Sequence, residues 1–479
     1  MGAVGARRVT ELMACAGLQP IELERYSRSN KIWQTKVKRL RLPDLLCVRT
    51  GLRVEVRAKS KLAIKMSDAP DNPDRRWNSG LAPEDVIAFV LIREAADGTI
   101  QAANNAEFFT VESLIATVAH SKLGPPKSAS EGAERDREWP STVASSDGEV
   151  QEVDETRLRT TLATGRNQTY QLRGKTAYFA VGVEFLGDSQ FLAGLPAAKA
   201  NLPDPEQVQW NPRDLLESES PIDRFVALKA LGVVGCEADL PAITAIADAD
   251  PDGRVALEAA ASLVRLGNDH GLELLRNAIA NPRVEYLRME SILALSEFHG
   301  TELSQRCAEL LAECAGNVAF AGDEIRQAAI WGLGKYGLRD YVHLLDFLDL
   351  PSDEERVHTV CGFGSDVDAG IVDTLITVLT NTDSSERKTA GASYILAKIV
   401  PAAQSVPRLV AVRNHNSART RNWVIATLGQ MNPAAVRQHF TDATLTAQLE
   451  PIQLISAETN WTRSEQIGEM LAFVRKQTV

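Results

Sequence analysis

A short motif recurs along the C-terminal half of the chain and restricts that half to a helical fold. Each copy has an Arg, then Leu or Ile four residues later, Leu seven residues later, and a small residue, Gly or Ser, directly after. Apolar residues at this spacing lie on one face of a helix. A stretch at 257–267 fits the same helix halfway between the first two copies, so the underlying period is 32 residues. The copies begin at Arg224, Arg288, Arg326 and Arg421.

The repeated segments resemble HEAT repeats. Each unit pairs one helix, such as 239–249 or 271–280, with a second helix that opens after Asp-Pro or Asn-Pro. A single helical pair cannot bury its apolar stripe, so the resemblance implies a HEAT-repeat α-solenoid over residues 216–440, with an extended surface for a protein partner. A C-terminal helical cap is expected over residues 441–479. We expect the recurrent Arg to brace its own unit by bonding an acid or a helix end, rather than to contact a ligand.

Two β-forming runs near the N-terminus place acidic and basic side chains on one surface. Residues 41–48 and 52–59 are separated by a turn, and the second run alternates apolar and charged residues, which predicts a β-hairpin. Successive side chains of a strand point to opposite faces. Glu55, Arg57 and Lys59 are therefore predicted to share one face of the second strand.

Asp44 lies eleven residues before Glu55, on the neighbouring strand of the same hairpin. Two carboxylates supply the hard oxygen ligands that a divalent cation such as Mg²⁺ prefers. A cationic side chain beside them can orient a water molecule or stabilise the charge that develops on a phosphoryl group. This set of residues suits phosphodiester hydrolysis.

The hairpin resembles the PD-(D/E)xK nuclease superfamily, and the resemblance covers roughly the first quarter of the chain. A Pro-Asp pair ending at Asp44 matches the first element, and the Glu-Val-Arg run from Glu55 to Arg57 matches the second, with Arg where the family has Lys. The resemblance implies a restriction-endonuclease-like α/β core over residues 1–125. It also implies Mg²⁺ or Mn²⁺ as cofactor, held by Asp44 and Glu55.

Arg57 in the position of the family's lysine leaves two alternatives open. Arg keeps its proton, so it binds phosphate well but is a poor base for activating water. Lys59, on the same face, takes over the cationic role if the domain is catalytic. Otherwise the domain is a degenerate nuclease fold that binds nucleic acid without cutting it. The family's first helix often contributes an acid, which makes Glu11 a candidate, with an exposed helix Glu as the alternative.

The flanking sequence predicts the other elements of such a core. Residues 6–17 have apolar side chains at helical spacing and end at a Gly, which predicts a helix. Residues 85–92 form a continuous apolar run suited to a buried central strand. Thr110 is a candidate N-cap for a following helix. The core face of that helix is predicted to consist of Leu114, Ile115 and Val118.

Charge is distributed unevenly along the chain. The whole chain carries a formal net charge of −11, whereas residues 1–80 hold 17 Lys and Arg against 8 Asp and Glu, a net +9. A basic N-terminal part on an acidic body predicts contacts with phosphate groups, and DNA is the expected partner. The alternative is that these cations belong to solvated hairpin faces. The expected nucleic-acid-binding residues are Lys36, Lys38, Arg39, Arg41, Arg53, Lys61, Lys65, Arg75 and Arg76.

The middle of the chain connects these two parts. Residues 121–155 are rich in Ser, Pro, Gly, Glu and Asp, which predicts a partly ordered linker. Residues 157–196 contain strand-like runs separated by turn residues, which predicts a small β-rich subdomain. The linker and subdomain together are expected to span residues 126–215. The predicted fold class is therefore multidomain, with α+β parts followed by an all-α part.

Several function classes lack sequence support. The six cysteines have no CxxC spacing, which argues for reduced thiols and against zinc. Neither a Walker A motif nor GxSxG is present, so ATP hydrolysis and serine hydrolysis are not indicated. No apolar run approaches the length of a membrane span, and the first residues lack the apolar core of a signal peptide. A cytoplasmic protein without membrane contacts is expected.

Two classes of function fit these patterns. The first is a metal-dependent nuclease, with DNA as the expected substrate and a HEAT-repeat docking module, a layout typical of prokaryotic restriction or phage-defence effectors. The second is a non-catalytic nucleic-acid-binding adaptor or HEAT-repeat scaffold with a degenerate nuclease fold. Similar bacterial repeats also occur in bilin lyases, where a basic nuclease-like head is not expected.

Overall fold

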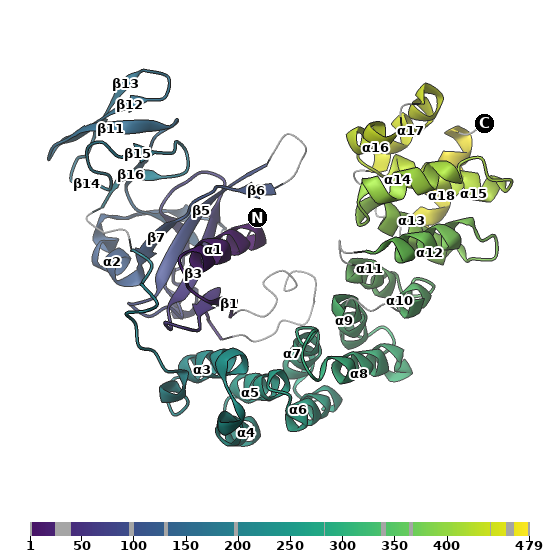
Figure 1. Cartoon of the computed structure of the whole chain (residues 1–479), viewed down its shortest axis with the longest axis horizontal. Coiled ribbons are helices and arrows are strands. Elements are labelled where there is room, and N and C mark those ends of the chain that lie inside the picture. Colours follow the sequence, from purple (N-terminus) through teal and green to yellow (C-terminus); the bar gives the residue numbers. More distant parts are fainter. Residues whose placement is uncertain are drawn as a thin grey trace. The chain divides into compact units, whose positions relative to one another are not determined.

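The computed structural model describes most of the chain and divides it into two compact units. The first unit runs to Leu266 and the second begins at Gly267; Figure 1 labels their elements. The described residues are 2–23, 40–94, 100–128, 133–195, 200–281, 283–336, 342–363, 367–440, 442–456 and 464–477.

A mixed β-sheet forms the centre of the first unit (Figure 1). Its strand order is β1-β2-β3-β5-β6, and β7 also pairs with β5. The first three strands are antiparallel neighbours, whereas β3 and β5 run parallel. The predicted hairpin is confirmed, with Leu45 opposite Val54. The strands are β1 (Pro20–Glu22), β2 (Leu45–Cys47), β3 (Arg53–Lys59), β5 (Val86–Glu94), β6 (Ile100–Ala102) and β7 (Glu107–Thr110).

Helix α1 (Gly2–Cys15) covers one face of this sheet. Its buried Val9 and Met13 pack on Val54 and Val90 of the strands. Gly17, with φ of +80°, ends the helix region in the left-handed conformation that glycine adopts without steric cost. Because Val54 faces α1, the alternation along β3 places the odd-numbered residues on the other face, as the sequence predicted.

Aromatic residues dominate the core on the opposite face. Phe89 and Phe109 pack edge to face, with ring centroids 6.0 Å apart, and Phe191 from the β-rich subdomain joins them. Helix α2 (Val111–Ala116) begins after Thr110, whose side chain accepts a hydrogen bond from the Ser113 amide, so the predicted N-cap is confirmed. Leu114 is buried as expected. Ile115 is 41% exposed, because adjacent residues of a helix point in different directions and Leu114 takes the buried one.

The predicted linker at 121–155 is wrong in its local structure, because much of this segment forms strands. β9 (Arg135–Glu138) pairs with β8 (Lys122–Pro126) on one side and with β4 (Lys65–Asp68) on the other. β4 lies in the connection between β3 and β5. Salt bridges across these strands replace hydrophobic alternation: Asp136 contacts Lys65 and Lys127, each at 2.8 Å. A polar composition therefore hid strands whose partners lie far away in the sequence. The 3₁₀ turn η1 (Pro73–Arg75) follows β4.

The β-rich subdomain contains two further sheets. One has the order β13-β12-β11-β15 and the other β10-β16-β14. Within the predicted strand-like region, residues 176–185 form two short strands, β14 and β15. Val150, Leu158 and Phe185 are buried in the hydrophobic core of this subdomain. The strands are β10 (Ser141–Val143), β11 (Gly148–Val153), β12 (Arg157–Leu162), β13 (Asn167–Gln171), β14 (Thr176–Ala177), β15 (Glu184–Phe185) and β16 (Phe191–Gly194).

Helical pairs begin within the first unit. Buried Val226 and Ala230 of α3 pack on Leu23, Leu46 and Val48 of the sheet region. The helix therefore covers one side of the paired strands β1 and β2. The helices of this unit are α3 (Pro221–Val234), α4 (Leu240–Ala249) and α5 (Gly253–Arg265), preceded by the turns η3 (Pro212–Leu215) and η4 (Glu237–Asp239).

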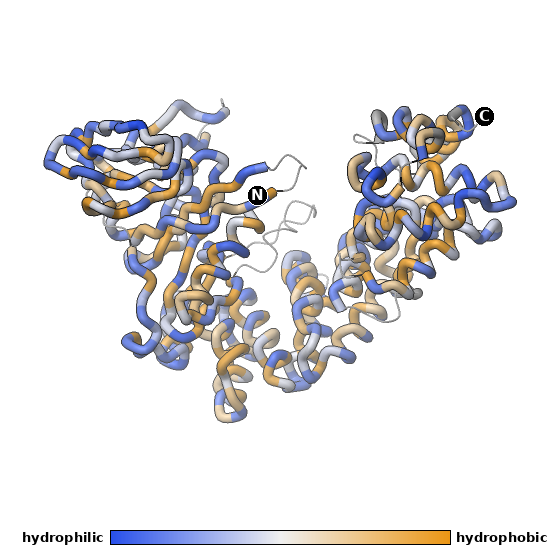
Figure 2. Tube along the Cα trace, turned by 45° about the horizontal axis from the view of Figure 1, so that its top comes forward, coloured by the Kyte–Doolittle hydropathy of each residue, from blue (hydrophilic) through white to orange (hydrophobic). Residues whose placement is uncertain are grey.

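The described part of the second unit is helical, with hydrophobic stretches along its helices (Figure 2). None of the described helices is long and apolar enough to cross a membrane. The elements are α6 (Asp269–Ala280), α7 (Glu285–Leu295), α8 (Ser304–Gly316), η5 (Val318–Phe320), α9 (Glu324–Leu333), η6 (Gly334–Tyr336), α10 (Val342–Phe347), α11 (Asp353–Gly362), α12 (Ala369–Thr380), α13 (Glu386–Lys398), α14 (Ala402–Ala411), α15 (Ala418–Gly429), α16 (Pro433–His439), α17 (Ala443–Ser456) and α18 (Ser464–Gln477).

The recurrent arginines brace the helical repeats, as the sequence predicted. Arg224 binds Asp250 through two hydrogen bonds of 2.8 and 3.0 Å. Arg288 donates to the Ile279 carbonyl at 2.9 Å, near the end of α6. The corresponding arginines later in the chain, Arg326 and Arg421, likewise donate to carbonyl groups that precede their own helices. Arg288 and Arg326 thereby satisfy carbonyl groups in the last turns of α6 and α8, which a helix end leaves without partners.

Candidate functional site

A polar pocket of about 290 Å³ lies beside β2 and β3 and contains the two predicted acids. Asp44 precedes β2 and Glu55 lies on β3, so the antiparallel hairpin brings both carboxylates to the pocket wall. Three guanidinium groups accompany them. The residues that line the pocket are Arg41, Leu42, Asp44, Glu55, Val56, Arg57, Arg76, Trp77, Ser79 and Leu81.

The backbone of β3 holds Asp44 in place. Its Oδ2 accepts a hydrogen bond of 2.6 Å from the Val56 amide. Burial raises the pKa of the Asp44 carboxyl above 3.8, against the lowering effects of this hydrogen bond and of Arg57. Glu22 of β1 also raises the pKa of Asp44 by charge repulsion. Sequence reasoning missed Glu22, because only the β1–β2 pairing brings it near Asp44.

Glu55 and Arg57 form an ion pair within the pocket. Arg57 Nη1 lies 2.7 Å from Glu55 Oε1, as expected for side chains on the same face of a strand. The buried Nε of Arg57 has no hydrogen-bond partner among the described residues. The Arg57 side chain as a whole is 34% exposed and lines the pocket, so an anion there can meet the accessible part of its guanidinium.

Lys59 is on the predicted face but does not line this pocket. Two residues beyond Arg57, its ammonium group donates a hydrogen bond to the Lys65 carbonyl and lies 5.9 Å from the centroid of the Phe89 ring. Burial, and secondarily repulsion from Arg57, lowers the pKa of Lys59 to about 8. The fold thus directs this lysine toward β4 rather than toward the two acids.

Glu11 lies apart from the pocket as well. It sits on α1, which covers the other face of the sheet, and its side chain is 51% exposed. Its carboxylate accepts a hydrogen bond of 2.8 Å from Arg8, one turn earlier on the helix. The structure therefore gives Glu11 the role of an exposed helix Glu, the alternative that the sequence left open.

The predicted phosphate-binding cations separate into distinct groups. Arg41 and Arg76 line the pocket, whereas Lys61 and Arg75 are exposed outside its lining. Lys65 is paired with Asp136. The remaining residues among those predicted, Lys36, Lys38 and Arg39, lie outside the described residues.

The side chain of Arg53 is largely buried and pairs with carboxylates of the fold. Its side chain is only 12% exposed and its Nε donates to Asp85 at 2.6 Å. Asp223 at the start of α3 lies 3.3 Å from another of its nitrogens. A guanidinium already shared between two carboxylates has little capacity left for phosphate, so we remove Arg53 from the expected phosphate contacts.

The chemistry of the pocket fits a divalent cation in part. Asp44 and Glu55 are hard oxygen donors, and Mg²⁺ commonly takes only one or two protein carboxylates, with water and phosphate oxygens as the other ligands. Each carboxylate also has a competing partner, the Val56 amide or Arg57. Within the described ranges, no group of three or more His, Cys, Asp or Glu side chains is arranged to hold a metal ion.

Replacing Asp44 with Asn is expected to leave the protein at least as stable as the wild type near neutral pH. The amide oxygen can still accept the Val56 hydrogen bond, while the cost of a buried charge disappears. Because the pKa of Asp44 is raised in the folded protein, wild-type stability falls as the pH rises from 3.8 through that raised value. The advantage of the variant should therefore shrink as the pH is lowered toward 3.8.

Urea unfolding of wild type and Asp44→Asn across this pH range measures the difference. Asp71→Asn is the matched control, because Asp71 is exposed and the same change should have little effect. A loss of stability at neutral pH in Asp44→Asn alone would show that the charge of Asp44 is compensated in the folded state.

Comparisons with known proteins identify the helical part of the chain. A family model for HEAT repeats matches residues 213–296. The C-terminal helical region therefore contains HEAT repeats. No curated protein sequence matches this chain. The family model lies outside the region that carries Asp44 and Glu55, so the resemblance to PD-(D/E)xK nucleases remains a prediction.

Solved structures give distant likenesses. YibA of Escherichia coli has a TM-score of 0.27 and 14% identity, covering 58% of this chain and 92% of its own. The complex of CpcE and CpcF of phycocyanin lyase from a Nostoc species has a TM-score of 0.27 and 19% identity, with coverages of 54% and 98%. Human deoxyhypusine hydroxylase has a TM-score of 0.21 and 16% identity, with coverages of 56% and 93%. Likenesses this weak carry no conclusion about function.

Proposed function

We propose that this protein is a non-catalytic adaptor, in which HEAT repeats dock a protein partner and the N-terminal pocket binds the phosphodiester backbone of a nucleic acid. The observation that carries the nucleic-acid part is the convergence of Arg41, Arg57 and Arg76 on one pocket. Guanidinium groups match phosphate oxygens in geometry and stay charged at any physiological pH. HEAT repeats supply the extended surface that protein docking requires.

The arrangement around the acids favours binding over cleavage. Glu55 is paired with Arg57, and one oxygen of Asp44 is already an acceptor for the Val56 amide. Lys59 is the candidate to replace the family's lysine. Its ammonium group donates a hydrogen bond to the Lys65 carbonyl and does not line the pocket with the two acids. Arg57, which remains in the pocket, is a phosphate ligand rather than a proton-transfer group.

Binding of labelled oligonucleotides to the full-length protein tests the adaptor. We expect Arg41→Ala and Arg76→Ala each to weaken binding by about tenfold and to reduce its salt dependence, because each removes one phosphate contact. Fluorescence anisotropy with duplex DNA, single-stranded DNA and RNA at several salt concentrations gives both quantities and distinguishes the polymers.

Arg75→Ala is the matched control, because Arg75 is exposed next to Arg76 but does not line the pocket. Its effect should be clearly smaller than that of Arg76→Ala. The nucleic-acid part of the proposal fails if the wild type binds none of the three polymers, or if all three arginine variants behave alike.

A second candidate function is metal-dependent phosphodiester cleavage at the same pocket. The observation in its favour is that Asp44 and Glu55, contributed by neighbouring strands, line a single pocket. Both residues would hold Mg²⁺ or Mn²⁺, which when bound polarises a phosphoryl oxygen and activates water. Arg41 and Arg76 would position the phosphate, and Arg57 would bind it rather than transfer a proton.

Incubation with each nucleic acid in Mg²⁺ or Mn²⁺, and then in EDTA, decides between the two functions. For an enzyme, Asp44→Asn and Glu55→Gln should abolish cleavage and leave most of the binding intact. Lys59→Ala should keep most activity, because its ammonium group is engaged outside the pocket. If the wild type cleaves nothing yet binds, the adaptor stands alone.

A further inference from the structure

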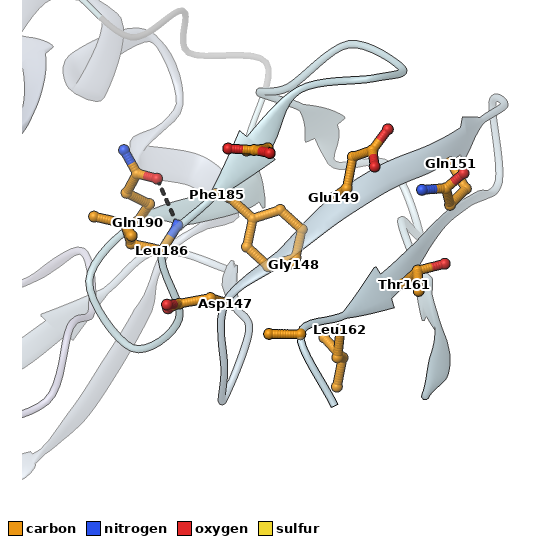
Figure 3. A pocket seen from close by; sticks show the side chains of 11 residues that line it. Asp147, Gly148, Glu149, Gln151, Thr161, Leu162, Phe185, Leu186 and Gln190 are labelled. Carbon is orange, nitrogen blue, oxygen red and sulfur yellow. Dashed lines mark hydrogen bonds between the residues drawn. The ribbon is translucent and has the colours of Figure 1, made fainter. Parts of the chain in front are cut away.

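A second pocket lies on the β-rich subdomain, far along the chain from Asp44. It encloses about 650 Å³ between β11, β12 and the end of β15. Its apolar lining comes from Leu162, Ala163, Phe185 and Leu186. Figure 3 shows the Phe185 ring beside Gly148, and a Cβ on that glycine would lie 2.8 Å from the ring. Only glycine at this position leaves the ring where it forms the pocket lining.

The polar lining of this pocket has one sign of charge. Asp147, Glu149 and Glu184 contribute carboxylates, and the described lining contains neither Lys nor Arg. Glu149 and Glu184 are direct partners in the antiparallel pairing of β11 with β15, so their side chains share one face. Like charges directly opposite each other on neighbouring strands destabilise a sheet. A cation from outside would relieve this repulsion.

Among the strands that the structure describes, the one that carries Glu184 lies at a sheet edge and is flanked by apolar side chains. β15 stands at the end of the sheet order β13-β12-β11-β15. Val181 and Leu186, on either side of β15, are 59% and 44% exposed. Figure 3 shows Leu186 next to Gln190, whose Oε1 accepts the Leu186 amide hydrogen bond of 2.8 Å. An edge strand can accept an additional strand from another chain.

We propose that this groove binds an extended cationic segment of a partner protein, in which Lys or Arg alternates with apolar residues. Alternate side chains of such a segment point to opposite sides, so cations can face Glu149 and Glu184 while apolar residues contact the exposed Leu186. The segment's backbone lies along β15 as an added strand. The three carboxylates repel nucleic acid, so this site does not depend on the function assigned to the Asp44 pocket.

A labelled peptide of alternating Lys and Val, added to the full-length protein, tests the proposal by fluorescence anisotropy. We expect saturable binding that Glu184→Lys and Glu149→Lys each weaken at least about tenfold, because each reverses a contact charge. Glu155→Lys is the matched control, because Glu155 is exposed in the β11–β12 turn, outside the pocket lining. The affinity of this variant for the peptide should stay within about twofold of that of the wild type. Circular dichroism checks folding, and Glu184→Lys should not lower the melting temperature, because it converts a repulsive pair into an attractive one.

Each other outcome counts against the proposal. Absence of binding to the wild type overturns it, and so does equal binding of a Lys and Ser peptide, which would reduce the site to charge without the apolar groove. Equal losses of affinity in Glu155→Lys and Glu184→Lys would overturn it as well, because the effect would then come from net charge alone. Self-association in sedimentation experiments that Glu184→Lys abolishes would assign the groove to a second copy of this chain instead.

Discussion

Replacing Arg53 with Ala is expected to lower the free energy of unfolding of the first unit by about 3 kcal/mol, because it leaves a buried carboxylate without its partner. That carboxylate is Asp85, which is 1% exposed and accepts a hydrogen bond of 2.6 Å from Arg53. The parallel register that sets Val54 beside Val86 brings the two residues together, one position earlier on each strand. Burial already raises the pKa of Asp85 even with Arg53 in place.

Hydrogen exchange of the β3 and β5 amides measures this loss of stability in the first unit, separately from the helices of the second unit. Arg49→Ala is the matched control. Arg49 pairs with Glu206 at 2.7 Å, but both side chains are largely exposed, and such pairs contribute about 0 to 1 kcal/mol. Unchanged exchange in Arg53→Ala would mean that Arg53 is not structural, and would return it to the candidates for phosphate contact.

A single methyl group at Gly334 is expected to destabilise the second unit by about 3 kcal/mol, the upper part of the range for overpacked sites. Gly334 follows α9, where a Cβ would lie 1.8 Å from the Gly362 carbonyl oxygen at the end of α11. The obstacle is backbone, so it cannot move aside as a flexible side chain does. Gly334→Ala must therefore separate the two helices locally.

Gly316→Ala is the matched control for this prediction. Gly316 is the last residue of α8, and a Cβ there meets no atom within 4 Å. Alanine at this position should increase stability by about 0.5 kcal/mol, because it reduces the conformational freedom of the unfolded chain. Thermal unfolding of both variants gives the comparison. Equal melting temperatures would contradict the close helix contact.

Local features of the candidate site were predictable from the sequence, whereas its composition was not. The hairpin and its alternation placed Glu55 and Arg57 correctly on one face, because a period of two is a property of any strand. The same rule correctly placed Lys59 on that face. Lys59 lies two residues beyond Arg57 along the strand, however, and its side chain is outside the pocket lining. Arg76 entered the pocket from the connection after β3, and no sequence pattern indicates that path.

The sequence by itself determined the helical repeats, the bracing role of their arginines and the faces of β3. These features depend on residues close together in the chain, whose spacing fixes which side chains meet. The tertiary structure alone decided that β9 pairs with β4 and that Arg53 serves Asp85 and Asp223, which are 32 and 170 residues away. The sequence around a charged residue looks the same whether its side chain contacts solvent, phosphate or a distant carboxylate. Its role is fixed only when the fold brings its partner to it.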